Sequence, residues 1–330
     1  MRSSQEIGSA CRSDSDAQIL RDGGPATCAQ PWQPTSFWIV AKESHEEPVS
    51  TRPARGSGRR EHFLDLKGRG RIRVIEYEGP EGAPTLMLLH GLGATGTLNW
   101  LRAFSDLAER YHVVAVDHRG HGQGIPTRNF RLKDCADDVV AVADDLGIRQ
   151  FIAVGYSMGG PIAKLCWSRH PGRVRGLVLC ATARHFTPER YPVLTRAVLP
   201  GAVVGARMMP NLVRSQIIEG MTRDLPSQEA KDFVRKEMSG ADPAALAQAT
   251  RAVLRFSSRN WASDIRVPTS VIVTTRDKIV PTRRQYALAA AIPGAKQFEV
   301  DGDHFACAVR STGFVEKLVA ACDYVDSAAA

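Results

Sequence analysis

A serine stands between two glycines near the middle of the chain, in the segment FIAVGYSMGG at residues 151–160. The apolar residues before it are typical of a buried strand, and the segment PIAKLCW after it is typical of a helix. The pattern G-x-S-x-G between a strand and a helix predicts a nucleophile elbow, a sharp turn that holds the serine hydroxyl clear of both elements. Gly155 and Gly159 suit this turn because a side chain at either position would collide with the neighbouring strand or helix. Ser157 is therefore the candidate nucleophile.

A serine hydroxyl becomes a good nucleophile when a base accepts its proton and a third group orients that base. Asp277 lies just beyond the strongly apolar strand predicted in VIVTTRDKIVP, and His304 lies just beyond the next predicted strand, in FEVDGDHF, so both are expected on loops after strands. In an open α/β sheet the carboxyl ends of the parallel strands meet at one crevice. We therefore predict a triad in which His304 is the base and Asp277 orients it. The weaker candidates for the acid are Asp264, Asp117 and Asp303.

Acyl transfer also requires hydrogen-bond donors aimed at the charge that develops on the carbonyl oxygen, each contributing about 3 kcal/mol. The backbone N–H of Met158, directly after the serine, is one expected donor. The other is the N–H of Leu92 in the segment LMLLHGLGATG, where glycines such as Gly91 allow the loop to turn tightly. His90 precedes them, and we expect it to fix the loop by hydrogen bonds rather than to act as a base.

The elements that must position these residues alternate between strand and helix. The segment HFLDLKGRGRIRVIEYEG at 62–79 alternates around KGRG like a β-hairpin. Five apolar runs follow, separated by helical stretches: TLMLLH, HVVAVD, FIAVGY, GLVLCA and TSVIVTT. Strand KQFEVDGDH and helix FVEKLVAACDYV end the chain. Continuous apolar runs suit parallel strands buried on both faces, so the sequence predicts an α/β fold with a doubly wound sheet.

The strand pattern stops between residues 184 and 263, where we expect a helical cap. Pro200, Gly201 and Pro210 interrupt an apolar run there, which predicts short amphipathic helices. The apolar side chains of this run either cover a hydrophobic substrate or pack the cap onto the body. They are Val193, Leu194, Val198, Leu199, Val203, Val204, Met208 and Met209.

The domain organisation follows from these breaks in pattern. We expect the α/β core to comprise residues 62–183 and 264–325, with the cap at 184–263 between them. Residues 1–61 are rich in Ser, Pro, Gly, Gln and charge and show little periodicity, which predicts a disordered N-terminal extension.

Composition narrows the class of protein. The 330 residues are 43% hydrophobic and 24% charged, as in soluble globular proteins. No apolar run approaches the roughly 20 residues needed to span a bilayer, and the polar N-terminus lacks the apolar stretch of a secretory signal, which together predict a cytoplasmic protein. The seven cysteines lack C-x-x-C spacing and predict neither a disulfide framework nor a zinc site. Cys166 and Cys180 lie in apolar segments and are expected to be buried.

The net charge of +8 is unevenly distributed. Residues 184–260 carry twelve basic and seven acidic side chains. This region is either a solvated basic surface or one that contacts anionic membranes or acidic substrates peripherally. Nucleic acid is not an expected partner because no nucleic-acid-binding motif accompanies the charge.

Five segments together resemble the α/β-hydrolase fold superfamily: HGLG, DHRGHGQG, GYSMGG, TRDKIVP and GDH. The order serine, acid, histidine along the chain is also that of the superfamily. The resemblance implies an eight-stranded, mostly parallel sheet flanked by helices, with a helical cap inserted after the sixth strand. It also implies that the DHRGHG turn is architectural. The residues of this turn that are therefore left out of the catalytic set are Asp117, His118, Arg119 and His121.

The expected function is that of a serine hydrolase, esterase-like or lipase-like, which cleaves a hydrophobic or acyl carboxylic ester through an acyl-enzyme intermediate. A small-molecule ester is the expected partner, and no metal or organic cofactor is implied. Three alternatives stay open: a C–C bond hydrolase resembling the meta-cleavage-product hydrolases, a cofactor-free haloperoxidase-like enzyme, and a ligand-binding protein without turnover. A serine at position 157 disfavours the haloalkane dehalogenases and epoxide hydrolases of this fold, which use an aspartate there.

Overall fold

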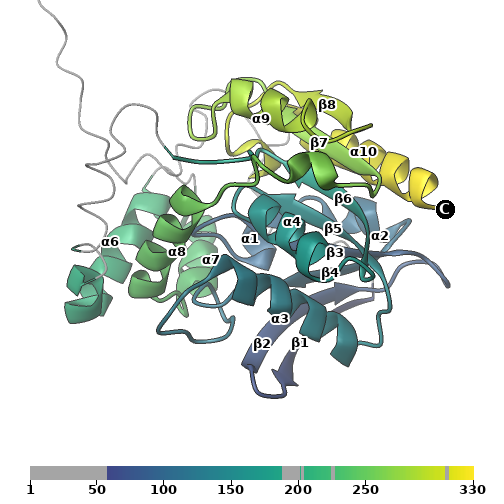
Figure 1. The fold of residues 1–330 in the computed structure, drawn as a ribbon. Coiled ribbons are helices and arrows are strands. Elements are labelled where there is room, and N and C mark those ends of the chain that lie inside the picture. The colour runs from purple at the N-terminus through teal and green to yellow at the C-terminus, as the bar shows by residue number, and fades with distance from the viewer. Residues whose placement is uncertain (1–57, 188–200, 202–203, 224–226, 309–311) are drawn as a thin grey trace, which may run out of the picture. The chain divides into compact units, whose positions relative to one another are not determined.

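The computed structural model describes residues 58–187, 201, 204–223, 227–308 and 312–330. Eight strands form one sheet in the order β1-β2-β4-β3-β5-β6-β7-β8 (Figure 1). β1, β2 and β4 are joined by antiparallel pairings, and all later pairings are parallel, so the predicted mostly parallel sheet is confirmed. The strands are β1 (Arg59–Leu66), β2 (Gly70–Tyr77), β3 (Thr85–Leu89), β4 (His112–Val116), β5 (Phe151–Tyr156), β6 (Val174–Cys180), β7 (Thr269–Thr274) and β8 (Lys296–Val300).

Helices cover both faces of the sheet. Side chains of α3, α4 and α9 join one buried cluster, and side chains of α1, α2 and α10 join the other. Figure 1 shows α3 and α4 side by side on one face. These helices are α1 (Gly96–Trp100), α2 (Phe104–Ala108), α3 (Leu132–Asp145), α4 (Gly159–Arg169), α9 (Thr282–Ala289) and α10 (Phe314–Ala329).

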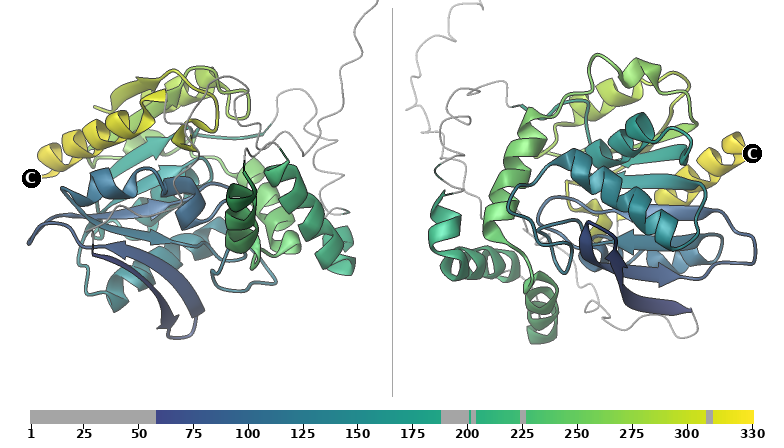
Figure 2. Two further views of the ribbon diagram at one scale, coloured as in Figure 1. Left: turned by 180° about the vertical axis from the view of Figure 1, so that it is seen from behind. Right: turned by 60° about the horizontal axis from the view of Figure 1, so that its bottom comes forward.

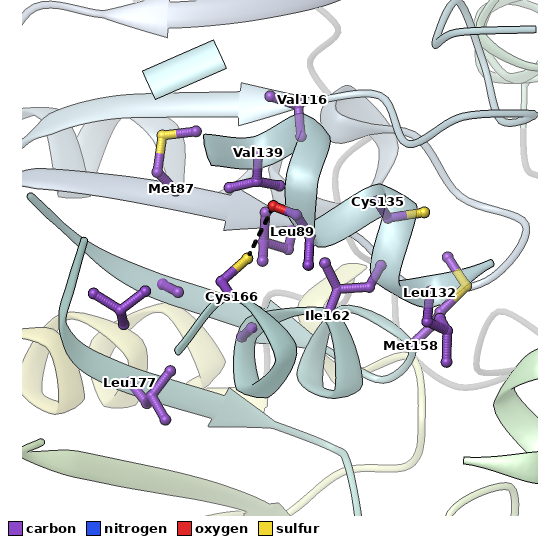
Figure 3. Close-up of a cluster of buried hydrophobic side chains, with 14 of the residues drawn as sticks. Met87, Leu89, Val116, Leu132, Cys135, Val139, Met158, Ile162, Cys166 and Leu177 are labelled. Carbon is purple, nitrogen blue, oxygen red and sulfur yellow. Dashed lines mark hydrogen bonds between the residues drawn. The ribbon is translucent and has the colours of Figure 1, made fainter. Parts of the chain in front are cut away.

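The two covered faces explain why the central strands are apolar at every position. In β3, Met87 and Leu89 belong to the cluster beneath α3 and α4, whereas Leu88 belongs to the cluster on the other face. All three are fully buried. Figure 3 shows Met87 and Leu89 among the side chains of α3 and α4, including Ile162 and Cys166. Burial of each such side chain stabilises the fold by about 1.5–3 kcal/mol, so alternation with polar residues would be costly.

The first strand begins earlier than predicted. Arg59–Glu61 pair with the end of β2, so the boundary placed between residues 61 and 62 was wrong by three residues. These residues are exposed, and their polar side chains therefore lack the apolar alternation that indicates a half-buried strand. The hairpin itself is confirmed, with Gly68 at φ 71° in its turn. Residues 1–57 of the predicted extension lie outside the described residues.

Between β6 and β7 the described part of the chain includes the helices α6 (Pro210–Thr222), α7 (Gln228–Met238) and α8 (Pro243–Arg255). We call them the helical insertion. Figure 2 shows them gathered as a group, with α6 packed against both α7 and α8. Pro210 and Pro243 each stand in the first turn of a helix, where the missing N–H would have no partner in any case. Ser227 and Asp242 cap α7 and α8 with their side-chain oxygens.

The apolar residues predicted for the cap divide into two groups. Val204, Met208 and Met209 are 56%, 77% and 55% exposed, so they do not pack into the body of the protein. The others lie outside the described residues; they are Val193, Leu194, Val198, Leu199 and Val203. Among the helices that the structure describes, none has the length and apolar character needed to cross a membrane.

The chain segments that enter and leave the helical insertion are fastened to α4. The Ser258 N–H donates to the Arg184 carbonyl at 2.7 Å, which joins the two segments. Lys164 of α4 is fully buried, and its Nζ donates to the Ala183 carbonyl at 2.8 Å and to the Ser258 hydroxyl at 3.0 Å. Burial, together with the charge of Arg184, lowers the pKa of Lys164 to about 7. The segments at both ends of the insertion are thus bonded to α4, the helix that follows Ser157.

Candidate active site

Ser157 occupies a strained turn between β5 and α4. Its φ is 52°, in the left-handed region that costs a residue with a side chain about 1–2 kcal/mol. Two hydrogen bonds hold the turn: the Ser157 N–H donates to the Cys180 carbonyl at 2.9 Å, and the Thr182 hydroxyl donates to the Ser157 carbonyl at 2.8 Å. The geometry is that of the elbow expected from the sequence. Sequence analysis did not identify Thr182, which follows the neighbouring strand β6 by two positions.

Close backbone contacts account for the two glycines of the elbow. A Cβ atom on Gly155 would lie 2.3 Å from the carbonyl oxygen of Gly159, and one on Gly159 would lie 2.1 Å from the carbonyl oxygen of Leu89. Both distances are far inside van der Waals contact, and the atoms met are backbone atoms that cannot move aside. Any larger residue would therefore displace Ser157 from its turn.

The side chains of Ser157, His304 and Asp277 form one hydrogen-bonded series. His304 Nε2 lies 2.8 Å from the Ser157 hydroxyl oxygen, and His304 Nδ1 lies 2.7 Å from Asp277 Oδ2. The three residues follow β5, β8 and β7, whose carboxyl ends lie at the same edge of the parallel sheet. Because a carboxylate only accepts, Nδ1 must donate to it, which leaves Nε2 as the acceptor for the serine proton.

Four further donors hold the carboxylate of Asp277. The N–H groups of Ile279 and Val280 donate to Oδ1 at 2.9 and 2.8 Å. The Thr274 hydroxyl and Gln285 Nε2 donate to Oδ2 at 2.9 and 3.0 Å. The side chain of Asp277 is fully buried, so these bonds replace water and fix the orientation of the carboxylate toward the imidazole. Sequence analysis did not identify Thr274 and Gln285 because their residue types alone carry no catalytic signal.

The other acids considered from the sequence have different surroundings. Asp264 and Asp303 are exposed. Asp117 is buried and accepts hydrogen bonds from the backbone N–H groups of Gly96, at the start of α1, and of Gln123. Within the described part of the chain, Asp277 is the carboxylate that contacts the imidazole of His304.

The two expected oxyanion donors border Ser157. Met158 follows it directly and precedes the first turn of α4. Leu92 lies in the loop between β3 and α1, and a Cβ on the adjacent Gly91 would lie 3.4 Å from the Ser157 Cβ, so this loop passes beside the nucleophile. In the described ranges, neither the Leu92 N–H nor the Met158 N–H donates to another group of the protein. The role of these two amides as oxyanion donors stays a prediction.

A buried histidine fixes the loop that carries Leu92. His90 Nδ1 lies 2.7 Å from the Gly91 carbonyl, and the His118 N–H donates to His90 Nε2 at 2.9 Å. Nδ1 is thus the protonated nitrogen. Burial, with smaller effects from His118 and His121, lowers the pKa of His90 well below its ordinary value. The Gly91 N–H donates to Asn99 Oδ1 at 2.9 Å, which ties the loop to α1. His90 therefore fixes the loop by hydrogen bonds, as expected from the sequence.

Tyr156 contacts His304 through a hydrogen bond to its backbone. It precedes Ser157, is buried, and its hydroxyl donates to the carbonyl oxygen of His304 at 2.9 Å. The two rings lie with their centroids 5.9 Å apart. Tyr156 thereby links the elbow to the loop after β8, a contact that sequence analysis did not identify.

The cysteines singled out from the sequence are buried in the structure. Cys166 and Cys180 are fully buried as predicted, and burial raises the pKa of both thiols. No three or more His, Cys, Asp or Glu side chains of this part of the chain gather as a metal ion would require.

Comparison with known proteins places this arrangement in a family context. The sequence profile of a family described as alpha/beta hydrolase fold matches residues 84–311. A protein named as the carbamate hydrolase RutD from Azorhizobium caulinodans is 30% identical over 262 residues, covering 76% of this chain and 96% of that protein. A pimeloyl-acyl-carrier-protein methyl ester esterase from Neisseria meningitidis is 29% identical over 229 residues, covering 66% of this chain and 84% of that protein.

Solved structures agree in fold. The enol-lactonase from Burkholderia xenovorans superimposes with a TM-score of 0.64 at 24% identity, covering 79% of this chain and all of that protein. At this identity the likeness concerns the fold alone.

Proposed function

The chain belongs to the α/β-hydrolase fold family, and from this premise we propose that it is a serine hydrolase that cleaves a carboxylic ester. The observation that carries the proposal is the series of contacts from Asp277 through His304 to Ser157, at 2.7 and 2.8 Å. A strained serine at the tip of a strand, a neutral imidazole in contact with it and a buried carboxylate behind the imidazole are the groups that acyl transfer requires.

In the acylation step the hydroxyl oxygen of Ser157 forms a bond to the ester carbonyl carbon while His304 Nε2 takes the hydroxyl proton. The carbonyl electrons move onto the oxygen, and this oxyanion accepts hydrogen bonds from the Leu92 and Met158 N–H groups. The bond to the alkoxy oxygen then breaks, and His304 gives its proton to the departing alcohol. Asp277 stabilises the imidazolium that exists between these two transfers.

Deacylation repeats the sequence with water. His304 takes a proton from a water molecule as the water oxygen bonds to the carbonyl carbon of the acyl-enzyme. The bond to the Ser157 oxygen then breaks, the proton returns to that oxygen, and the carboxylic acid leaves. The same two amides stabilise the second oxyanion, so the reaction needs one set of groups for both halves.

We place the substrate among hydrophobic or acyl esters. The names of the two relatives refer to a methyl ester and a carbamate. A carbamate ester, like a methyl ester, has a carbonyl carbon bonded to an alkoxy oxygen. Carbamates therefore belong in the same substrate panel as esters.

A fluorophosphonate probe tests the nucleophile. We expect stoichiometric labelling of the wild-type protein and none of Ser157→Ala, because the phosphonate traps a serine that a base has activated. Absence of labelling in the wild type would remove the hydrolase proposal and favour a ligand-binding protein.

A substrate panel tests the bond that is cleaved. It comprises p-nitrophenyl esters of increasing chain length, an aryl carbamate and a dienone substrate of the C–C hydrolase type. The proposal expects the highest kcat/KM with an ester. Faster turnover of the dienone than of every ester would assign the protein to C–C bond cleavage instead.

A further inference from the structure

A buried carboxylate of the helical insertion reaches the body of the protein. Glu237 stands in the last turn of α7 and is 5% exposed. Its two oxygens accept from the guanidinium of Arg73 in β2, at 2.7 and 3.1 Å. Oε2 also accepts from the Thr95 hydroxyl at 3.0 Å. Replacing a buried ion pair by apolar residues is often neutral or stabilising, so stability alone does not explain this one.

The charges in this cluster are balanced by more than one acid. Burial opposes the charge of Arg73, but its hydrogen bond to Glu237 and the charges of Asp117, Glu237 and Glu61 raise its pKa above the ordinary value. Arg73 Nε donates to Glu61 at 2.9 Å, and its Nη1 lies 3.5 Å from Asp117. Arg73 thus keeps acidic partners when Glu237 loses its charge.

Thr95 connects Glu237 to the start of α1. The Thr95 hydroxyl has a single proton, which it gives to Glu237, so its lone pairs face the helix. There the oxygen accepts from the Leu98 N–H at 3.1 Å and caps α1. The next residue, Gly96, donates its N–H to Asp117 at 2.8 Å. The first turn of α1 is therefore held by the same buried cluster that contains Glu237.

Helix α1 in turn holds the loop that carries Leu92. Asn99 of α1 accepts the Gly91 N–H at 2.9 Å, and only three residues separate Leu92 from the first residue of α1. The loop is bounded on one side by His90 and on the other by α1. A shift of α1 would therefore move the Leu92 N–H, which borders the nucleophile.

The insertion and α1 also pack against each other. Leu98 of α1 contacts an apolar cluster of the insertion formed by Met238, Ala241 and Leu246. Figure 1 shows α1 beside α7. Glu237 is thus the polar part of a larger contact between the helical insertion and the helix behind the oxyanion loop.

We propose that Glu237 is a positioning residue by which the helical insertion sets the alignment of the Leu92 amide, acting through Thr95 and α1. The proposal rests on the proposed hydrolase function for its catalytic consequence, but its structural claim concerns the loop at 90–95 and can be tested without turnover. The insertion then does more than border the site, because its docking completes the oxyanion hole.

The activity test compares Glu237→Gln with Glu229→Gln, an exposed acid on the same helix. For Glu237→Gln we expect kcat on p-nitrophenyl esters to fall about 10- to 100-fold with KM within about twofold, because a misaligned donor affects the transition state more than the bound ester. Affinity for a trifluoromethyl ketone, whose adduct carries an oxyanion, should fall by the same factor as kcat/KM. Glu229→Gln should match the wild type in all three measurements.

A second pair of variants tests the same link in case Glu237→Gln does not fold. Thr95→Val removes only the hydroxyl, whereas Thr95→Ser keeps it. We expect Thr95→Val to lower kcat and ketone affinity in the same direction, and Thr95→Ser to recover most of the loss. Equal activity of Thr95→Val and wild type, with both folded, would overturn the proposed link.

Amide hydrogen exchange over residues 90–98 tests the structural claim independently of turnover. Glu237→Gln should exchange faster than the wild type in this segment, and Glu229→Gln should not. Unchanged exchange in Glu237→Gln overturns the positioning role even if activity falls. If the wild type cleaves no ester and takes no fluorophosphonate, the proposed function fails, while the exchange result still decides whether Glu237 orders the loop.

Discussion

The candidate site has two halves that are held in place by different kinds of contact. We call Asp277 with His304 the acid half, and the loop that carries Leu92 the oxyanion half. The acid half is local: the donors to Asp277, apart from His304, lie between residues 274 and 285 and are uncharged groups. The oxyanion half is long-range: Arg73 of β2, Thr95 before α1 and Glu237 of α7 meet in one buried, charged cluster. The contacts of Asp277 thus involve residues that are close in sequence, whereas the contacts of Glu237 join the insertion to the body of the protein.

Because the two halves are held differently, substitutions in each should affect a different part of the reaction. Changes near Asp277 should alter proton transfer without involving the insertion. Changes near Glu237 should alter oxyanion stabilisation and should depend on how the insertion is seated.

Removing the charge that faces the imidazole should have the largest effect. We expect Asp277→Asn to lower kcat about 10⁴-fold, because the amide can donate to Nδ1 and so favours the wrong tautomer of His304. Steady-state kinetics on p-nitrophenyl butyrate measures this loss. Asp264→Asn, a change of the same kind at an exposed acid, is the matched control and should retain normal activity. Near-normal turnover by Asp277→Asn would move the orienting role to another group.

Acid should lower the free energy of unfolding because three buried histidines lie at and near the loop that carries Leu92. Burial lowers the pKa of His118 to about 3 and that of His121 to about 4, and burial, with the charges of His118 and His121, holds the pKa of His90 well below its ordinary value. These groups stay neutral in the folded state while the unfolded chain binds protons below about pH 6.5. The stability that these three histidines contribute is therefore fully present above that pH and is lost as the pH drops toward 4, by up to about 1.4 kcal/mol per pH unit for each histidine.

Urea unfolding between pH 7.5 and pH 4.5 measures this dependence. His118→Gln should reduce the slope of the unfolding free energy with pH by about one histidine's share. His170→Gln, outside the buried group, should keep the steep acid loss. A His118→Gln slope equal to that of the wild type would show that this histidine does not carry the effect.

Within the acid half, one hydroxyl is expected to matter modestly. Thr274→Val keeps the shape of the side chain but removes a donor to Asp277, and we expect kcat to fall about tenfold. Affinity for a trifluoromethyl ketone should fall less than in Glu237→Gln, because the oxyanion donors are untouched. Thr274→Ser should restore most of the activity. A larger loss of ketone affinity in Thr274→Val than in Glu237→Gln would contradict the division into two halves.

The smallest expected effect concerns the surface of the insertion, where contact with anionic membranes stays a prediction. Met208, Met209 and Leu212 are exposed and lie near Arg207, also exposed, on the segment leading into and along α6. We expect weak sedimentation with phosphatidylserine vesicles that high salt abolishes and Met208→Ser reduces. Phe63→Ser, at an exposed apolar residue of β1, is the control. Equal pelleting with neutral and anionic vesicles would reject membrane contact.

Ser157, Asp277 and His304 could be predicted from the sequence because short patterns around each residue indicate its place at the end of a strand. A serine between Gly155 and Gly159 requires a backbone turn that few other patterns permit. Asp277 follows the apolar, fully buried strand β7, and His304 follows the largely exposed strand β8. Neighbouring parallel strands bring their carboxyl ends to the same edge of the sheet. The mostly parallel sheet followed from the same continuous apolar runs.

The contacts that hold these reactive groups in place depend on the tertiary structure and could not be predicted from the sequence. Arg73 and Glu237 are 164 positions apart, and nothing in their surroundings marks either as buried or paired. Asn99 and Tyr156 act through single hydrogen bonds to backbone atoms, which any residue type could offer. Chain order determines which side chains stand at strand ends, whereas contacts between distant side chains depend on how helices and loops pack, and that packing has no short-range pattern.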